Sequence, residues 1–343
     1  MKKKWILIII ISLILISLAT IQITSVYETN APEIQEVQGR SKDQIRIKWN
    51  DCREKFKGDP YLEKPSASYP YRVGKLEEAF INDGLNMTNF VRYLAGLPDD
   101  LETDYVLNNQ AQYGAILLAA TKTLSHQPQK PNDMSNNFYD LGYNATKGSN
   151  IASGIYSLSD AVIGYMMDFG DANLENVGHR RWILNPQMKT IGFGYYEGYS
   201  TMNVLNKDRS EVIDYDYITY PTEGNFPSDL LYADSFPYGS NPWSIILNPL
   251  VYDNDRLSNI KVQLENLNDS RQWNFCPKDN DSDCDKYFKI DTSNCGVPFC
   301  IIFRPDNIYD YEDGDQYQVT VTGLYTIEGH EREIEYSVSF FEL

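Results

Sequence analysis

Hydrophobic and polar positions follow a helical period in the first part of the chain. In residues 86–98, apolar side chains recur at i, i+3, i+4 and i+7 from Met87, and the pattern stops before Gly96 and Pro98, which predicts a helix that ends there. Residues 104–124 carry small and apolar residues on one face, and residues 157–169 carry an apolar stripe that Ser159 is placed to cap. The pattern therefore predicts helices in these three segments.

The period changes to that of strands later in the chain. Residues 191–196 and 202–207 are short β-prone runs, and residues 260–267, 317–327 and 333–341 alternate apolar and polar positions. Glu328 and Gly329 separate the last two runs as a turn. We therefore expect an α+β domain over residues 71–215, followed by an antiparallel β-sandwich domain over residues 216–343, immunoglobulin-like or fibronectin-like in its pattern.

The first 70 residues show neither pattern. Residues 26–70 are polar, without a long apolar period, and we expect a linker or a strap that lies on the next domain. Residues 1–25 contain three lysines and then an uncharged run from Trp5 to Ser25, which is typical of a signal peptide or of an uncleaved, single-pass signal anchor. Either alternative predicts a protein that is secreted or held at the cell surface.

The composition limits the class of partner. The 343 residues include 30 Lys and Arg against 48 Asp and Glu, a formal net charge of −18. Such a surface repels nucleic acid, so we expect no nucleic-acid partner. Aromatic residues are plentiful, with 26 Tyr and 14 Phe, so the acidity is that of a folded, solvated surface.

Export permits disulfide bonds among the five cysteines. Cys52 stands alone, and four cysteines lie close together in the β-rich part: Cys276, Cys284, Cys295 and Cys300. These four permit three local pairings that the sequence does not separate, and Cys52 is left either free or as a link between chains. In a eukaryotic host the chain would also be a glycoprotein, with acceptor sequences at Asn86, Asn144, Asn268 and Asn280.

Two histidines are candidates for chemistry. His126 follows the second predicted helix, and His179 lies in the stretch "VGHRRWILNP". Their separation matches no metal-binding motif, so each by itself is most simply a core or surface histidine. Asp168, on the third predicted helix, would suit a divalent ion or raise the pKa of an imidazole, unless it is a solvated helix end. The chain contains no nucleophile elbow, H-E-x-x-H, Walker loop or G-x-G-x-x-G motif.

Six motifs together carry a resemblance to a known family. They stand in the order "LNMTNFVRYLAGLP", "LSHQPQKP", "GSNIASG", "DAVIGYMMDF", "VGHRRWILNP" and "IGFGYY" over residues 75–210. In this order they resemble the CAP superfamily of cysteine-rich secretory proteins, antigen 5 and pathogenesis-related proteins, and its bacterial SCP-like branch above all. The resemblance implies an α-β-α sandwich with a central cleft.

The resemblance also implies a set of cleft residues. The family's cleft holds two histidines and two acidic residues, and in some members the histidines bind a divalent metal. His126 and His179 stand at the histidine positions, Asp168 stands at one acidic position, and Ser149 replaces the glutamate at the other. With one carboxylate missing, a tight zinc site or a general base is doubtful. A weakly held divalent ion, zinc by ligand type, stays open at His126 and His179, and no other cofactor is expected.

The family has no agreed reaction, so the resemblance implies a class of function rather than a substrate. We expect an exported or membrane-tethered CAP-domain protein that binds an extracellular protein, a lipid or a cell-surface ligand. One alternative is a metal-dependent hydrolase or peptidase that uses His126, His179 and Asp168. The other is a carrier of a lipid or another small apolar ligand, which a hydrophobic groove would favour.

Overall fold

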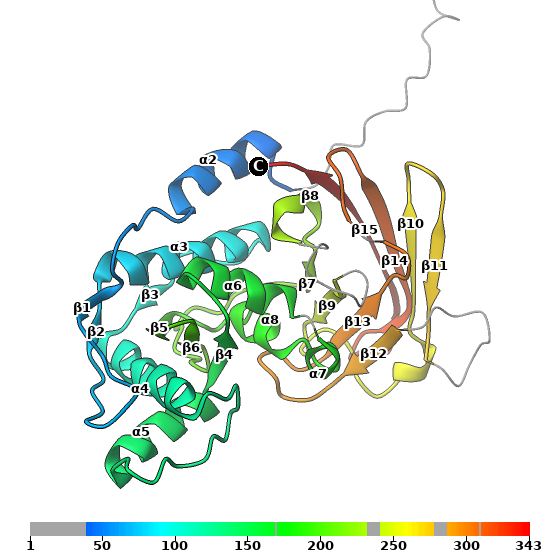
Figure 1. Ribbon diagram of the computed structural model, residues 1–343. Coiled ribbons are helices and arrows are strands. Elements are labelled where there is room, and N and C mark those ends of the chain that lie inside the picture. The colour runs from blue at the N-terminus through cyan, green and yellow to red at the C-terminus, as the bar shows by residue number, and fades with distance from the viewer. Residues whose placement is uncertain (1–38, 169, 232–240, 278–286, 309) are drawn as a thin grey trace, which may run out of the picture. The chain divides into compact units, whose positions relative to one another are not determined.

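The computed structural model describes residues 39–343 except for 169, 232–240, 278–286 and 309. The predicted signal peptide or anchor, residues 1–25, lies outside the described residues. Within them, no helix is both long enough and apolar enough to cross a membrane. Residues 39–343 group as one unit, in which helices mix with a four-stranded sheet and are followed by one sheet of five strands and one of four (Figure 1).

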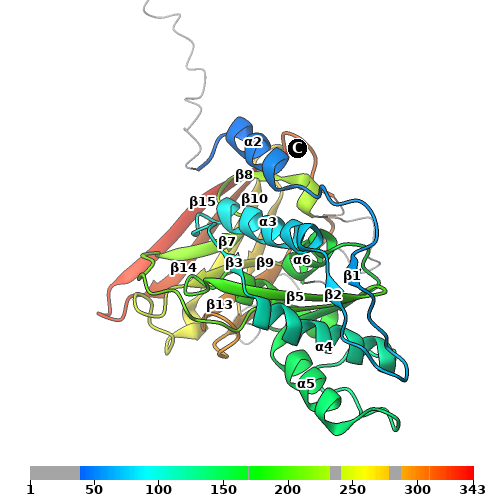
Figure 2. The same ribbon diagram turned by 90° about the vertical axis from the view of Figure 1, so that its left-hand side faces the viewer.

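The helical half is built around a four-stranded sheet in the order β3-β5-β6-β4. These strands are β3 (Glu102–Thr103), β4 (Ser149–Ser153), β5 (Thr190–Tyr196) and β6 (Tyr199–Asn203). In Figure 2, α3 (Glu78–Leu94) and α6 (Leu158–Met167) lie on one side of β5, and α4 (Tyr105–Thr121) and α5 (Asn136–Lys147) lie on the other. This is the α-β-α sandwich that the sequence predicted.

Small residues allow α4 to lie directly on the sheet. A Cβ atom at Gly192 or Gly194 of β5 would meet the backbone of α4 at Leu107 or Ala111. Polar side chains of α4 also bind the strand, because Gln112 accepts from the backbone N–H of Tyr195 at 2.8 Å and donates to its carbonyl at 2.9 Å. The small-residue face read from the sequence is therefore a contact between helix and strand.

The predicted helix over residues 157–169 is shorter than expected. It is α6, which Ser157 caps by accepting from the N–H of Asp160, so the prediction of Ser159 as the cap is wrong. The Ser159 hydroxyl instead donates to the carbonyl of Asp83 on α3 at 3.2 Å. Asp168 lies just after the helix in a left-handed conformation, with φ 50°. It is buried, with 1% of its surface exposed, and is not a solvated helix end.

Two short helices and one that the hydrophobic pattern missed complete this half. The short helices are α7 (Asp171–Leu174) and α8 (Gly178–Ile183), and the missed helix is α5, which Ser135 caps. Only three residues of α5 are buried, Gly142, Ala145 and Thr146. These three residues are small, so α5 presents no stripe of large buried side chains.

A helix lies within the predicted linker over residues 26–70. It is α2 (Lys42–Cys52), which begins with a capping box between Ser41 and Gln44. Ile45 and Cys52 are buried, and the Trp49 ring lies 5.3 Å from the Phe90 ring of α3. This part of the segment is therefore packed on the helical half. A two-stranded sheet comes next, formed by β1 (Tyr61–Glu63) and β2 (Lys75–Leu76).

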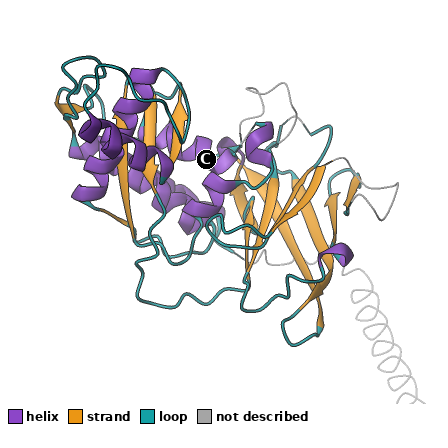
Figure 3. Cartoon of the chain, turned by 90° about the horizontal axis from the view of Figure 1, so that it is seen from below, coloured by secondary structure: helices purple, strands orange, loops and turns teal. Residues whose placement is uncertain are grey.

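Two sheets make up the second half of the chain (Figure 3). One has the order β11-β10-β14-β15-β8, formed by β8 (Gly224–Pro227), β10 (Lys261–Asn266), β11 (Gln272–Phe275), β14 (Gln316–Tyr325) and β15 (Glu331–Phe341). The other has the order β12-β13-β9-β7, formed by β7 (Tyr217–Tyr220), β9 (Trp243–Leu247), β12 (Tyr287–Asp291) and β13 (Cys300–Arg304). All neighbouring strands are antiparallel except β8 and β15, which are parallel.

Aromatic side chains fill the space between these two sheets. Trp243 of β9 lies 5.8 Å from Tyr317 of β14 and 6.2 Å from Phe340 of β15, measured between ring centroids. Phe275 of β11 and Phe303 of β13 make a further contact between the sheets at 5.0 Å. The sheets therefore face each other around one core, as in the β-sandwich that the alternation predicted.

The cysteines are not paired as the sequence predicted. Cys276 is disulfide-bonded, and Cys284 lies outside the described residues. Cys52, Cys295 and Cys300 are free, so each of the three local pairings, all of which use Cys295 and Cys300, is wrong. Cys300 is enclosed in the sandwich core, with 0% exposed, whereas Cys295 lies in the loop after β12.

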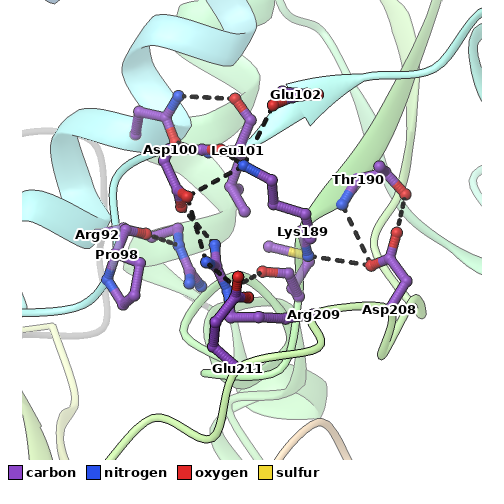
Figure 4. Close-up of polar contacts among 12 residues, drawn as sticks. Arg92, Pro98, Asp100, Leu101, Glu102, Lys189, Thr190, Asp208, Arg209 and Glu211 are labelled. Carbon is purple, nitrogen blue, oxygen red and sulfur yellow. Dashed lines mark hydrogen bonds and ion pairs between the residues drawn. The ribbon is translucent and has the colours of Figure 1, made fainter.

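A cluster of ion pairs joins the loop before β3 to the segment after β6 (Figure 4). Asp100 forms ion pairs with Arg209 and, at 3.0 Å, with Lys189. Asp208 accepts from the backbone N–H groups of Lys189 and Thr190 at 3.0 and 3.2 Å. The hydrogen bond from Arg209, together with Lys189, lowers the pKa of Asp100. Lys189 and Arg209 are thus each matched by a carboxylate.

Candidate functional site

His179 is held by a buried carboxylate. It lies in α8, and its Nδ1 is 2.7 Å from Oδ1 of Asp168, while Oδ2 of Asp168 accepts from the backbone N–H of Arg180 at 3.1 Å. The Tyr165 ring stacks on the imidazole with 5.5 Å between the centroids. Burial by itself lowers the pKa of His179, but the hydrogen bond and the charge of Asp168 outweigh it and raise this pKa above its ordinary value.

His126 is held only by backbone groups. It is exposed in the loop after α4, and its Nδ1 lies 2.8 Å from the carbonyl oxygen of Thr146. Because a carbonyl only accepts hydrogen bonds, Nδ1 of His126 donates this bond. The Thr146 hydroxyl returns a bond to the carbonyl of His126 at 3.3 Å. The two histidines therefore have anchors of different strength.

Strand β4 places the next two residues beside His179. Asn150 donates from Nδ2 to the carbonyl of His179 at 3.0 Å. Ser149, the residue at the family's glutamate position, is buried with 5% exposed, and its hydroxyl has no hydrogen-bond partner among the described residues. A buried hydroxyl without a partner is costly, so Ser149 marks a place where the protein itself does not satisfy a polar group.

Both histidines line two neighbouring hollows. The smaller hollow has a volume of about 410 Å³. Its lining residues come from several loops and elements: His126, Lys147, Ser149, Asn150, Ala172, Asn173, Asn176, Gly178, His179, Trp182, Leu205 and Cys295. The larger hollow has a volume of about 850 Å³ and shares His126, Ala172, Asn173 and His179 with the smaller one. The structure therefore brings the two predicted histidines to one cleft, although 53 residues separate them in sequence.

The larger hollow has mainly apolar walls. These side chains include Leu124, Ile151, Ile155, Tyr156, Ile163 and Met167. Tyr156 is 89% exposed and Leu124 is 51% exposed, so apolar surface is open to solvent at this hollow. A Cβ atom at Gly164, which also lines the hollow, would meet no atom within 4 Å. There is therefore free space directly beside α6.

The β-sandwich contributes to the smaller hollow. Cys295 lines it, and a Cβ atom at Gly178 would come within 2.8 Å of the Cys295 sulfur. The same loop is bound to α8, because the Arg181 guanidinium donates to the carbonyls of Ser293 and Val297 at 2.9 and 2.7 Å and pairs with Asp291. The cleft is therefore completed by a segment more than 100 residues further along the chain.

Sequence reasoning predicted only His126, Ser149 and His179 of this lining and missed the others, among them Cys295, Lys147 and Asn150. Cys295 drew notice only as a partner for a disulfide bond, and no sequence signal connects it to α8. Lys147 ends α5, a helix that the hydrophobic pattern did not reveal. Asn150, in contrast, stands directly after Ser149 inside the "GSNIASG" motif, so its place in the motif was a signal that could have found it.

A resident divalent metal does not fit the residues present. Each imidazole uses Nδ1 for another bond and retains Nε2, which suits a metal ligand. However, both oxygens of Asp168 are engaged, and Ser149 supplies no carboxylate. Among the described residues, no group of three or more His, Cys, Asp or Glu side chains is arranged to hold a metal ion, whereas zinc sites use at least three protein ligands.

Comparison with known proteins agrees with the family resemblance found in the sequence. Residues 85–207 match the family described as CAP, the cysteine-rich secretory protein family. No curated protein matches the chain. The matched segment contains His126, Ser149, Asp168 and His179 and excludes the β-sandwich. The match therefore identifies residues 85–207 as a CAP domain.

Proposed function

We propose that the protein is an exported binding protein whose ligand lies in the cleft of the CAP domain. The observation that carries this proposal is the meeting of two hollows at His126 and His179, whose walls combine apolar side chains with a few polar groups. Sites for small molecules are typically concave, of about 300–1,000 Å³, with apolar walls and a few polar groups that fix orientation. The apolar walls favour a ligand with an apolar portion, as in the carrier function considered from the sequence.

The larger hollow supplies the test of this proposal. Gly164→Trp fills the free space beside α6, so it should weaken binding of the neutral dye N-phenyl-1-naphthylamine at least roughly 10-fold, the effect of losing the contact of an apolar group. Gly164→Ala is the matched control, because a methyl group leaves most of the hollow open and favours the helix. Fluorescence titration of the full chain measures both affinities.

The outcome of this titration is decisive. Equal dye affinity for the wild type, Gly164→Ala and Gly164→Trp would show that the dye binds elsewhere. Absence of binding to the wild type by this dye and by the alkyl ligands decanoate and decanol would overturn the proposed function. Thermal unfolding of both variants shows whether the fold is retained.

Export is the second part of the proposal. The secretory description of the family and the disulfide bond at Cys276 support it, because disulfide bonds persist mainly in oxidising compartments. Protease added to intact cells should digest the protein if it is exposed at the surface, and the culture medium should contain it if it is released. Detection only inside the cell would contradict export.

The rival proposal is a metal-dependent hydrolase that uses the same cleft, and the lack of a fitting group of metal ligands among the described residues counts against it. Its support is the bond between Asp168 and His179, which orients an imidazole as catalytic dyads do. It needs about one metal ion per chain after purification and turnover that His179→Ala abolishes. Assays with peptide and ester substrates, together with metal analysis, would favour this rival over a binding function if both criteria were met.

A further inference from the structure

The charges around the smaller hollow differ from those of the rest of the protein. The chain has 48 acidic and 30 basic side chains, yet the described residues that line this hollow include Lys147 and two histidines and no Asp or Glu. Lys147 is exposed, and no carboxylate among the described residues forms an ion pair with it. In so acidic a protein, a hollow whose described lining includes a lysine and no carboxylate is suited to a negative ligand.

Ser149 supplies an independent observation at the same place. It is more than nine-tenths buried, lines the hollow, and its hydroxyl has no partner in the described part of the chain. A hydroxyl can donate a hydrogen bond to an anion. With glutamate at this position the hollow would carry a negative charge, and with serine it carries a donor.

The carboxylate that binds His179 already has partners within the protein. Asp168 is 1% exposed, accepts from His179 and from the backbone N–H of Arg180, and is absent from the lining of the hollow. Both of its carboxylate oxygens are therefore engaged within the protein. The mismatch with a resident divalent metal has the same physical origin, since a cation would find few anionic groups here.

We propose that the smaller hollow binds the anionic group of the ligand, a carboxylate or a phosphate, next to His126, Lys147, Ser149 and His179. This inference rests on the proposed binding function and names the chemical class of the ligand: an anionic head in the smaller hollow and an apolar portion in the larger one. The two hollows share both histidines, so one molecule can occupy them together.

The test uses ligands that share one chain length and differ in charge. Affinities of the full chain for decanoate, decanol and decyltrimethylammonium are measured by displacement of the neutral dye. We expect decanoate to bind roughly 10-fold or more tightly than the other two, which is the effect of one hydrogen bond to a charged group. Equal affinities, or a preference for the cation, would overturn the anionic site, while binding of decanol would still support the proposed function.

Inorganic phosphate distinguishes a free anion from the head of a larger ligand. We expect phosphate alone to bind at least roughly 10-fold more weakly than decanoate, because it leaves the larger hollow empty. Phosphate that binds as tightly as decanoate would support the anionic site but contradict the apolar portion of the ligand. Calorimetric titration of phosphate into the full chain provides this comparison.

Substitutions locate the anion. Lys147→Gln should weaken decanoate binding several-fold and leave decanol binding unchanged, whereas Lys130→Gln, at an exposed lysine that lines neither hollow, should change neither. Ser149→Glu restores a carboxylate and should remove the preference for decanoate over decyltrimethylammonium. If Lys147→Gln weakened decanoate and decanol binding equally, the anionic group would not be at this hollow.

Discussion

Two regions of the molecule use cationic side chains in opposite ways. One is the contact that Arg180 and Arg181 of α8 make with the β-sandwich, called the wall here. The other is the smaller hollow beside it. In the wall, the side chains of Arg180 and Arg181 are fully buried, and every guanidinium nitrogen donates a hydrogen bond to a protein oxygen. In the hollow, Lys147 is exposed without an ion pair, and the Ser149 hydroxyl has no partner in the described structure. One region satisfies its polar groups internally, and the other leaves them for something else to satisfy.

The partners of Arg180 show what a structural cation looks like in this protein. Its guanidinium donates to the carbonyls of Met166 and Met167 at the end of α6, at 2.6 and 3.1 Å. It also donates to the carbonyl of Pro242 and the hydroxyl of Ser244, at 3.0 and 2.8 Å. Arg180 therefore joins the helical half to β9, and its charge is fully used in the fold. At the hollow, by contrast, Lys147 has no ion pair and the Ser149 hydroxyl has no hydrogen-bond partner in the described structure.

The largest expected effect is the loss of stability when Arg180 is removed from this wall. Arg180→Met removes the charge and leaves buried carbonyl groups without a donor, so we expect the free energy of unfolding to fall by about 3–5 kcal/mol. Arg256→Met, at a side chain that is 49% exposed, should cost less than about 1 kcal/mol. Urea denaturation of both variants measures the difference. Equal losses would show that Arg180 is not a structural anchor.

A smaller, pH-dependent effect is expected at the ion pair of Arg181. Burial by itself raises the pKa of Asp291, but hydrogen bonds from Ser293 and Arg181 and the charge of Arg181 lower it below its ordinary value. A lowered pKa stabilises the folded state above the unfolded pKa of about 3.9, and this stabilisation is lost as the pH falls through the folded pKa. Asp291→Asn should therefore cost about 1–3 kcal/mol at pH 7.

The pH dependence is the distinctive part of this prediction. The difference in unfolding free energy between wild type and Asp291→Asn should be constant from pH 7 to about 5 and should shrink below about pH 4. Denaturation curves at several pH values provide the measurement. A difference that does not change with pH would mean that the carboxylate charge is not what stabilises the wall.

A third effect concerns Asp168, which accepts a hydrogen bond from the backbone of Arg180 and raises the pKa of His179. In Asp168→Asn, burial is no longer opposed by a negative charge, so the pKa of His179 should fall. The wild-type stabilisation by protonated His179 is fully present below about pH 6.5 and is lost as the pH rises through the raised pKa of the folded state. The variant should therefore lose about 1–2 kcal/mol at pH 6 and less at pH 9.

NMR titration of the imidazole signals measures that pKa directly. Asp160→Asn is the matched control, because Asp160 is exposed at the start of the same helix. If the His179 titration were the same in Asp168→Asn and in the wild type, the hydrogen bond between Asp168 and His179 would not govern the imidazole.

The smallest expected effect on stability is that of a substitution at Lys147, beside the hollow. Lys147 lies in the last turn of α5, where a cation interacts favourably with the helix dipole. Lys147→Gln should therefore cost no more than about 0.5 kcal/mol of unfolding free energy, in contrast to its several-fold effect on decanoate binding. A loss comparable to that of Arg180→Met would place Lys147 among the structural cations and remove the contrast between the regions.

The hydrophobic pattern predicted the helices and strands that bury a continuous face. The helices α3, α4 and α6 and the strands β10, β14 and β15 each carry a regular apolar stripe, and this stripe survives in the sequence because burial requires it. Helix α5 was missed because it buries few residues. The cap of α6 was misplaced because two serines stand two residues apart, and only packing against Asp83 decides which of them caps.

The candidate site was predicted only in part. The order of motifs led to His126, Ser149, Asp168 and His179, and the two histidines line one cleft. The sequence did not reveal that Cys295 belongs to the same hollow, because its position depends on how the sandwich packs against α8. The disulfide bonds expected at Cys295 and Cys300 are absent for the same reason, since proximity in sequence does not by itself place two sulfur atoms together.

The sequence by itself determined the two structural halves, the histidines of the cleft and the replacement of a carboxylate by Ser149, because these depend on local periodicity and residue identity. Only the tertiary structure decided that the charge of Asp168 is taken up by His179 and Arg180, that Arg180 and Arg181 are anchors, and that the polar groups around Lys147 and Ser149 remain open. Hydrogen bonding and burial depend on which distant segments pack together, and a short stretch of sequence does not determine that packing.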